Sequence, residues 1–350
     1  MRNDRPIIEL PRLIDVRYNA FEHIPNAIEK LKLDGPAVLI ADLQTMKIAG
    51  NRIMEILEKN YQISPILIKK ATLNEAKKVI EYYQETAANF AIAVGGGSVI
   101  DIAKFSSFEH KIPFISVPTV ASHDGIASAR ASLSDSNKRH SLEAHSPFAV
   151  IGDVETLAKA PKRFSISGCG DIISNITAVL DWELSNRITG EHLSQYAIAL
   201  SRMTAKTLMA SKDIILKDPI EATDTVLKGL ITSSMAMCIA GSSRPASGAE
   251  HMISHVLDET AKTPGLHGEQ CGISSIISMY FHGGNWQEIK NTLEVIGAPT
   301  SATQINISSE EFIHAITAAN NVRKDRFTIL SSGISKEASE KALVETGIIN

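Results

Sequence analysis

The chain has 350 residues, of which 44% are hydrophobic, and its formal net charge is −4. This length predicts two domains that can each bury a hydrophobic core, and the dispersed Lys and Arg residues form no basic stripe of the kind that binds nucleic acid. Neither a signal-peptide core nor a run of about 18 apolar residues is present, so we expect a cytoplasmic protein without a transmembrane segment.

Short apolar runs alternate with helical stretches in the first half of the chain. The runs are mostly rich in Val and Ile and end at Asp, Gly or Pro, which is typical of strands. Helical spacing over residues 73–88 and 98–110 predicts crossover helices, so we expect a parallel sheet in a Rossmann-like α/β domain. The five expected strands are Ala37–Asp42, Ile63–Ala71, Phe90–Gly96, Pro113–Thr119 and Phe148–Asp153.

The pattern changes twice after the fourth strand. Residues 128–144 contain a polar turn between two extended segments, which predicts a β-hairpin inserted before the last strand. After Asp153 helical periodicity dominates, for example over residues 191–211 and 219–241. We therefore expect a nucleotide-binding α/β domain over residues 1–153 and an all-α helical bundle over residues 154–350, and its apolar helices leave room for a homo-oligomer.

Three consecutive glycines follow the third expected strand, in FAIAVGGGSVIDIAKF (Phe90–Phe105). Glycines let backbone N–H groups approach an anion, and the helix starting near Ser98 points its positive end at the same place. A pyrophosphate fits this environment, although a tight strand-to-helix turn without a ligand is the alternative. Asp42 is a candidate for the adenine-side ribose or a simple turn former, and nearby Lys47 leaves a 2′-phosphate possible.

The loop after the fourth strand is rich in small polar residues. Ligands of open α/β sheets lie at this carboxyl edge. Thr119, Ser122 and Ser128 can offer hydroxyls to phosphate or nicotinamide, and Asp124 can hold a substrate hydroxyl. A plain turn at residues 123–125 is the alternative interpretation.

Three histidines and one aspartate in the second half form a candidate metal site. His251 and His255 stand one helical turn apart, His267 follows a Pro-Gly turn, and Asp171 lies in what reads as a glycine-rich loop. A carboxylate with two or three imidazoles is typical of a divalent metal that keeps a position open for substrate. Such a site, in the cleft between the two domains, would polarise a hydroxyl or carbonyl oxygen for hydride transfer.

The three cysteines, Cys169, Cys238 and Cys271, bear on this site. Their odd number and wide spacing argue against a disulfide framework and favour a reducing compartment. Cys169 and Cys271 are close in sequence to Asp171 and His267, so a zinc–thiolate site is an alternative. Small buried cysteines, however, often line a site without binding the ion.

The assembled motifs resemble the sn-glycerol-1-phosphate dehydrogenases, a branch of the superfamily of glycerol dehydrogenases, metal-dependent alcohol dehydrogenases and 3-dehydroquinate synthases. The resemblance runs in order from about Pro36 to Gly272. It is carried by GGGSVIDIAKF, VPTVASHDGIASARASL, SGCGDIISN, SRPASGAEHMISH and LHGEQCG.

The resemblance implies a role for individual residues. It implies one zinc ion per subunit on Asp171, His251 and His267. Asp124, Asp171 and His255 would face the substrate as catalytic residues, which makes His255 a proton-relay residue rather than a ligand. Contacts to NAD or NADP are implied at Gly97, Ser98, Val99, Ile100, Asp101, Thr119, Val120, Ala121, Ser122 and Ser128.

The implied reaction interconverts dihydroxyacetone phosphate and sn-glycerol 1-phosphate, the backbone of archaeal ether lipids, with NADH or NADPH. The substrate phosphate needs a cation, for which we expect Arg244, with Lys138 or Arg139 as weaker candidates. The alternatives are a glycerol or other polyol dehydrogenase, a lyase of the dehydroquinate synthase type, and a non-catalytic zinc and nucleotide sensor.

Overall fold

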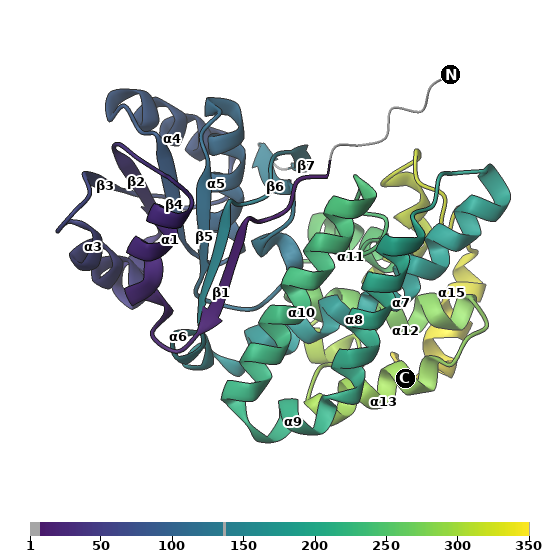
Figure 1. Ribbon diagram of the computed structural model, residues 1–350. Helices are drawn as coiled ribbons and strands as arrows, with labels where there is room; N and C mark the ends of the chain where they lie inside the picture. Colours follow the sequence, from purple (N-terminus) through teal and green to yellow (C-terminus); the bar gives the residue numbers. More distant parts are fainter. Residues whose placement is uncertain (1–7, 136–137, 350) are drawn as a thin grey trace. The chain divides into compact units, whose positions relative to one another are not determined.

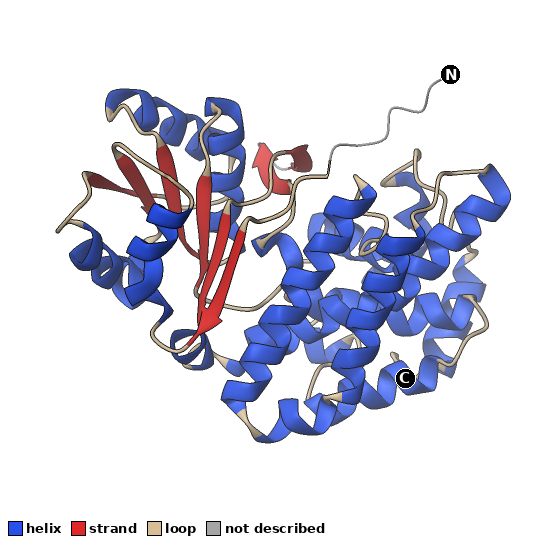
Figure 2. Cartoon of the chain, viewed as in Figure 1, coloured by secondary structure: helices blue, strands red, loops and turns tan. Residues whose placement is uncertain are grey.

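The computed structural model describes residues 8–135 and 138–349, which form two compact units, Glu9–Lys162 and a second unit that begins at Arg163. The first contains all the strands of the described residues and the second is helical (Figure 2). This division lies nine residues after the expected boundary at Asp153, since a short helix, α6 (Val154–Ala158), follows the last strand within the first unit. None of the helices among these residues is long and apolar enough to cross a membrane.

The first unit is built on a six-stranded parallel sheet, so the expected sheet is confirmed. Its strands occur in the order β1-β8-β5-β4-β2-β3. β2, β4, β5 and β8 are buried along their whole length, which explains why each reads as a continuous apolar run. The strands are β1 (Leu13–Arg17), β2 (Ala37–Ala41), β3 (Ile63–Leu67), β4 (Phe90–Gly95), β5 (Phe114–Pro118) and β8 (Ala149–Asp153).

Helices cover both faces of this sheet (Figure 1). A hydrophobic core joins η1, α1 and α3 to the strands on one face, and α5, which packs on β4 and β5, lies with α4 on the other. The expected hairpin is confirmed as β6 (Arg130–Asp135) and β7 (Lys138–Glu143). The helices are η1 (Ala20–His23), α1 (Ile24–Lys30), α2 (Leu43–Thr45), the π-helix η2 (Met46–Gly50), α3 (Asn51–Leu57), α4 (Leu73–Glu85), α5 (Gly97–His110) and η3 (Asp124–Ile126).

Strand order places the glycine loop at a switch point of the sheet. From β2 the chain continues outward to β3, whereas from β4 it continues in the opposite direction to β5. The carboxyl ends of β2 and β4 therefore flank the position where open α/β sheets bind ligands. Gly96 and α5 follow β4 directly at this position.

The second unit is a bundle of helices, as expected. Its longest member, α7, spans 28 residues and carries Asp171 in its interior, so the expected glycine-rich loop is wrong and the segment is helical. The other helices are α8 (Gln195–Ala210), α9 (Lys212–Lys217), α10 (Pro219–Ala240), α11 (Ala249–Thr260), α12 (His267–Phe281), α13 (Trp286–Ile296), η4 (Thr303–Ile305), α14 (Ser309–Ala318), η5 (Ala319–Asn321) and α15 (Lys336–Glu345), with α7 at Lys162–Thr189.

Candidate metal centre and nucleotide loops

Glycines hold α7 and the start of α12 in direct backbone contact. A methyl group added at Gly268 would lie 1.8 Å from the carbonyl oxygen of Ser167, and one at Gly170 would lie 2.1 Å from the carbonyl oxygen of Gly268. Only residues without a Cβ allow backbones to approach this closely. Asp171 follows Gly170 and His267 precedes Gly268, so the same contact brings the carboxylate and the imidazole together.

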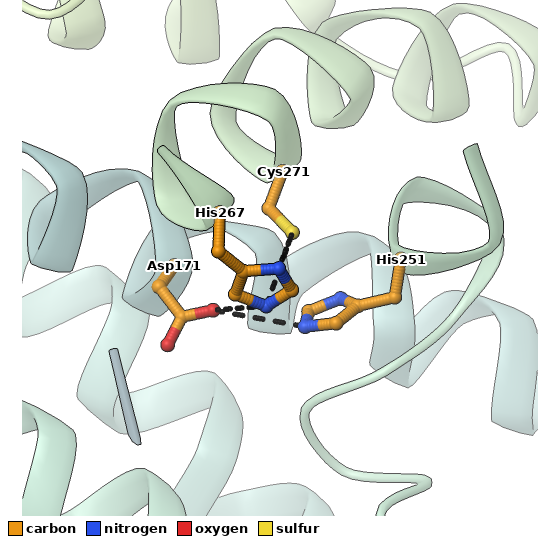
Figure 3. Close-up of side chains that lie close together, drawn as sticks. All are labelled: Asp171, His251, His267 and Cys271. Carbon is orange, nitrogen blue, oxygen red and sulfur yellow. Dashed lines mark hydrogen bonds and ion pairs between the residues drawn. The ribbon is translucent and has the colours of Figure 1, made fainter. Parts of the chain in front are cut away.

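The ligands predicted from the resemblance meet at one point. The Nε2 atoms of His251 and His267 each lie 3.6 Å from Oδ1 of Asp171 (Figure 3). Cys271, one turn after His267 on α12, adds a sulfur atom to the cluster, and one ligand atom from each of the four residues lies within 4.8 Å of all the others. Asp171 and His251 are buried, and His267 is half-buried.

Outer hydrogen bonds orient both imidazoles. Nδ1 of His251 lies 3.0 Å from Oε1 of buried Glu250, and Nδ1 of His267 lies 3.2 Å from the Ser254 hydroxyl, which itself donates to Gln270. Each Nδ1 is thereby placed to donate, which leaves the lone pair on Nε2, the atom that faces Asp171. Glu250 was missed by the sequence analysis, although its position directly before His251 is visible in GAEH.

Without an ion, the electrostatics of the cluster favour protonation of His251 and His267. Burial alone would lower the pKa of His267, but the Cys271 sulfur and the Asp171 carboxylate outweigh it and raise the pKa to about 9. The pKa of His251 is also raised, against burial, by Cys271, Asp171 and Glu250. Burial opposes ionisation of the Cys271 thiol, yet the two imidazoles lower its pKa. A cation at this point would replace those protons.

The donor atoms have the spacing that a divalent metal needs. Nitrogen and oxygen ligands at about 2.0–2.1 Å from a tetrahedral zinc ion lie about 3.3 Å from one another. The two 3.6 Å separations measured here are close to that value. Asp171, His251 and His267 therefore fit a bound metal ion.

His255 lies outside this cluster. It is on α11 one turn after His251, half-buried, and its ring centroid is 6.5 Å from that of His267. This position suits a residue that lies near the bound ion without being one of its ligands.

The two predicted nucleotide segments of the sheet unit lie against each other. The Thr119 amide donates to the Gly95 carbonyl, and a methyl group at Gly97 would lie 2.0 Å from Nε2 of His123. Nδ1 of His123 in turn accepts a hydrogen bond from the Gly125 amide. Half-buried Gly97 and exposed Ser98 begin α5, whereas Asp101, Thr119 and Ser128 are buried.

A fully buried lysine, which the sequence analysis missed, ties these segments together. The ammonium of Lys104 lies 3.1 Å from Oδ1 of Asp101, on the preceding turn of α5. It also donates to the carbonyl oxygens of Gly125 and Arg130 at 2.6 and 2.7 Å. The i,i+3 spacing of Asp101 and Lys104 within the apolar stretch VIDIAKF was the available signal.

Arg244 does not serve as the expected phosphate cation. The residue is 2% exposed, and its guanidinium forms a bidentate ion pair with Glu191 and donates to Ser185 and the Phe327 carbonyl. All three guanidinium nitrogens are engaged within the helical unit, so the expectation is wrong. The side chains of Lys138 and Arg139 lie outside the described residues.

Asp42 caps a helix. Its Oδ1 accepts hydrogen bonds from the amides of Gln44 and Thr45, and Thr45 Oγ1 accepts from the Asp42 amide. This geometry matches the turn-forming alternative.

Comparison with known proteins places these sites in context. The sequence profile of the family described as iron-containing alcohol dehydrogenase matches residues 15–161. The glycerol-1-phosphate dehydrogenase [NAD(P)+] of Pyrococcus horikoshii is 47% identical over 344 residues, which cover 98% of this chain and 99% of the relative. That of Methanosarcina acetivorans is 45% identical over 350 residues, 100% of this chain and 98% of the relative.

Solved structures support the fold. The glycerol dehydrogenase of Schizosaccharomyces pombe superposes with a TM-score of 0.80 at 20% identity, over 97% of this chain and 90% of that one. A probable glycerol dehydrogenase from Sinorhizobium meliloti gives 0.78 at 17% identity, over 97% of each chain. With full-length relatives at nearly half identity, this chain belongs to the family of glycerol-1-phosphate dehydrogenases.

Proposed function

We propose that this protein is an NAD(P)-dependent and zinc-dependent dehydrogenase that interconverts dihydroxyacetone phosphate and sn-glycerol 1-phosphate, and so supplies the backbone of archaeal-type ether lipids. The observation that carries the proposal is the convergence of Asp171, His251 and His267 in a chain that is 47% identical along its length to a curated glycerol-1-phosphate dehydrogenase. The site would perform the activity for which these relatives are named.

The residues of the helical unit would hold and orient the ion. Asp171, His251 and His267 would bind zinc, with Glu250 and Ser254 fixing the two imidazoles. Bound zinc supplies Lewis acidity, which stabilises negative charge on the substrate oxygen. His255 would donate the proton that completes the alcohol, because it lies beside His267 without being among the clustered donors.

The residues of the sheet unit would hold the nucleotide. The first turn of α5, from Gly97 to Asp101, would contact the pyrophosphate, with the backbone N–H groups of Gly97 and Ser98 as donors and the positive end of a 14-residue helix as support. The segment from Thr119 to Ser122, with Ser128, would contact the nicotinamide side. The nicotinamide supplies the hydride. We further propose that Asp124, at the start of η3, contacts the substrate hydroxyl.

An assay with purified protein tests the proposal. NADH or NADPH should be consumed with dihydroxyacetone phosphate, the chelated enzyme should be inactive, and zinc should restore it. His267→Ala should lose zinc and activity while keeping its far-ultraviolet circular dichroism, and His314→Ala, an exposed position on α14, should keep both. Oxidation of glycerol without any activity on dihydroxyacetone phosphate would instead select the polyol dehydrogenase.

We also propose that the enzyme works in the cytoplasm as a homo-oligomer. None of the three cysteines forms a disulfide bond, which suits a reducing compartment. On α8, Tyr196 and Met203 expose 83% and 55% of their surface, which suits a self-association surface. Light scattering coupled to gel filtration tests the assembly, and a single-subunit mass would contradict it.

A further inference from the structure

We propose that His123 is a further nucleotide-binding residue, whose Nε2–H group donates a hydrogen bond to the pyrophosphate of NAD or NADP at the start of α5. This role depends on the proposed function, which places the pyrophosphate at that helix. It adds a side-chain donor to a site that otherwise offers backbone N–H groups. His123 is half-buried and stands directly before η3, between two segments that already have proposed roles.

A hydrogen bond within the loop fixes the tautomer of the His123 ring. The Gly125 amide donates to Nδ1 of His123 at 3.0 Å, and the extended backbone of His123 at the N-cap of η3 permits this short contact. Because Nδ1 accepts this bond, it carries no proton, and the proton of the neutral ring is on Nε2. Nε2 of His123 is therefore a hydrogen-bond donor.

This donor atom faces the first residue of α5. A methyl group added at Gly97 would lie 2.0 Å from Nε2 of His123 and 2.7 Å from the adjacent ring carbon Cε1, so the edge of the ring that carries the donor is turned toward Gly97. The Cα–Cβ bonds of a helix tilt toward its N-terminus, so the ring lies at the N-terminal end of α5. Any side chain at position 97 would displace the imidazole, which explains the need for glycine there.

Backbone donors are available at the same end of the helix. Val99 and Ile100 both donate to the Gly96 carbonyl. The amides of Gly97 and Ser98, by contrast, have no acceptor within residues 8–135 and 138–349, and no side chain caps this helix. A pyrophosphate presents several anionic oxygen atoms, so it can accept hydrogen bonds from these amides and from the imidazole together.

Two substitutions separate the roles of the two ring nitrogens. Asn places its side-chain oxygen near the position of Nδ1, so His123→Asn keeps an acceptor for the Gly125 amide but removes the donor beside Gly97. Gln is one carbon longer, so His123→Gln places an amide N–H near the position of Nε2 and gives up the bond to Gly125. Fluorescence titration with NADH and calorimetric titration with ADP-ribose, which contains the pyrophosphate but no nicotinamide, measure binding to the full-length protein.

The expected order of affinities is specific to a phosphate donor. We expect His123→Asn to bind NADH and ADP-ribose about 10–100-fold more weakly than the wild type, because it loses a hydrogen bond to a charged group. His123→Gln should retain most of the affinity for both ligands. His110→Asn, at the far end of the same helix, is the matched control and should bind both ligands as the wild type does.

The contrary outcomes are distinct. If His123 only shapes the turn at residues 123–125, the order reverses, with His123→Asn normal and His123→Gln weak, and the proposal is overturned. A loss seen with NADH but not with ADP-ribose would also overturn it, because His123 would then act at the nicotinamide. If the wild type binds neither NADH nor NADPH, the proposed function fails too, whereas normal affinity in both variants refutes only the role of His123.

A structural measurement covers the case in which His123→Asn does not fold, as circular dichroism would show. In a crystal structure of the wild-type protein with ADP-ribose, Nε2 of His123 should lie within about 3.2 Å of a pyrophosphate oxygen. A bound ADP-ribose whose phosphate oxygens all lie beyond hydrogen-bond distance of Nε2 would contradict the proposal.

Discussion

Replacement of Lys104 by methionine should destabilise the sheet unit and weaken nucleotide binding. The side chain of Lys104 is 0% exposed and its ammonium bonds to Asp101, itself 5% exposed, and to the carbonyl oxygens of Gly125 and Arg130. Methionine keeps most of the length and apolar volume but leaves the Asp101 carboxylate buried without its cation. It also removes donors from two carbonyl groups that hold the loop after β5.

The size of the effect follows from burial. Removing one partner of a buried ion pair costs about 3–5 kcal/mol, a large share of the roughly 5–15 kcal/mol that stabilises a typical domain. An exposed i,i+4 pair is worth about 0.3–0.5 kcal/mol, so Lys159→Met, whose partner is Glu155, is the matched control. The double variant Lys104→Met/Asp101→Asn should recover part of the loss, because it no longer buries an isolated charge.

Two measurements check this prediction. Urea unfolding followed by circular dichroism gives the free energy of unfolding, and fluorescence titration gives the dissociation constant for NADH. We expect Lys104→Met to lose several kcal/mol more than Lys159→Met and to bind NADH more weakly under conditions in which it is still folded. If the two variants lose the same stability, the buried contacts of Lys104 do not hold this region and the reasoning is refuted.

Three further predictions concern the metal cluster. Glu250→Gln should weaken zinc binding about 10–100-fold in chelator competition, because it weakens the hydrogen bond that orients His251. Glu259→Gln, at an exposed position on the same helix, should leave zinc binding unchanged. Equal zinc affinities of the two variants would show that the hydrogen bond to His251 is dispensable. Gly268→Ala should lose zinc, since its methyl group would lie 1.8 Å from a carbonyl oxygen. Gly272→Ala, whose methyl group would have its nearest contact at 3.3 Å, should lose less zinc. A Gly268→Ala protein with a full complement of zinc would contradict the close approach of the two backbones. Zinc affinity should rise with pH up to about 9, because the pKa of His267 is raised to about 9 and below this pH the ion must displace a proton. Calorimetry in buffers of different ionisation enthalpy measures the number of protons released. A zinc affinity that does not change with pH would contradict this prediction.

Burial explains which strands could be predicted from sequence. The structure buries four of the five expected strands over the full length of β2, β4, β5 and β8, so nearly all their side chains on both faces are apolar and the runs are easily seen. β1, by contrast, lies at the edge of the sheet beside β8 and has exposed or half-exposed side chains along its length. Its sequence, LIDVR, carries two charges in five residues, and no local pattern distinguishes it from a loop.

Partners distant in sequence explain the errors at the site. Arg244 reads as an available cation near the metal helix, yet its charge is matched by Glu191, 53 residues away, and by a carbonyl 83 residues away. Local spacing contains no trace of these contacts. Local spacing also gives no sign of the contacts of Lys104, whose hydrogen-bond acceptors, the carbonyl oxygens of Gly125 and Arg130, lie 21 and 26 residues further along the chain.

The glycines around Asp171 show how one residue type supports two opposite inferences. In SGCGDIISN they read as a loop, because glycine weakens a helix by about 1 kcal/mol relative to alanine. In the structure they lie within α7, and at Gly170 the missing Cβ is required by the backbone of α12 rather than by any turn. The helix tolerates this weakness because tertiary packing, not intrinsic propensity, supplies most helical stability in a folded protein. A carboxylate on a buried helix is also held more rigidly than one on a loop, and a ligand set with atoms 3.6 Å apart depends on that rigidity. The sequence feature that suggested flexibility is therefore the one that fixes the metal centre.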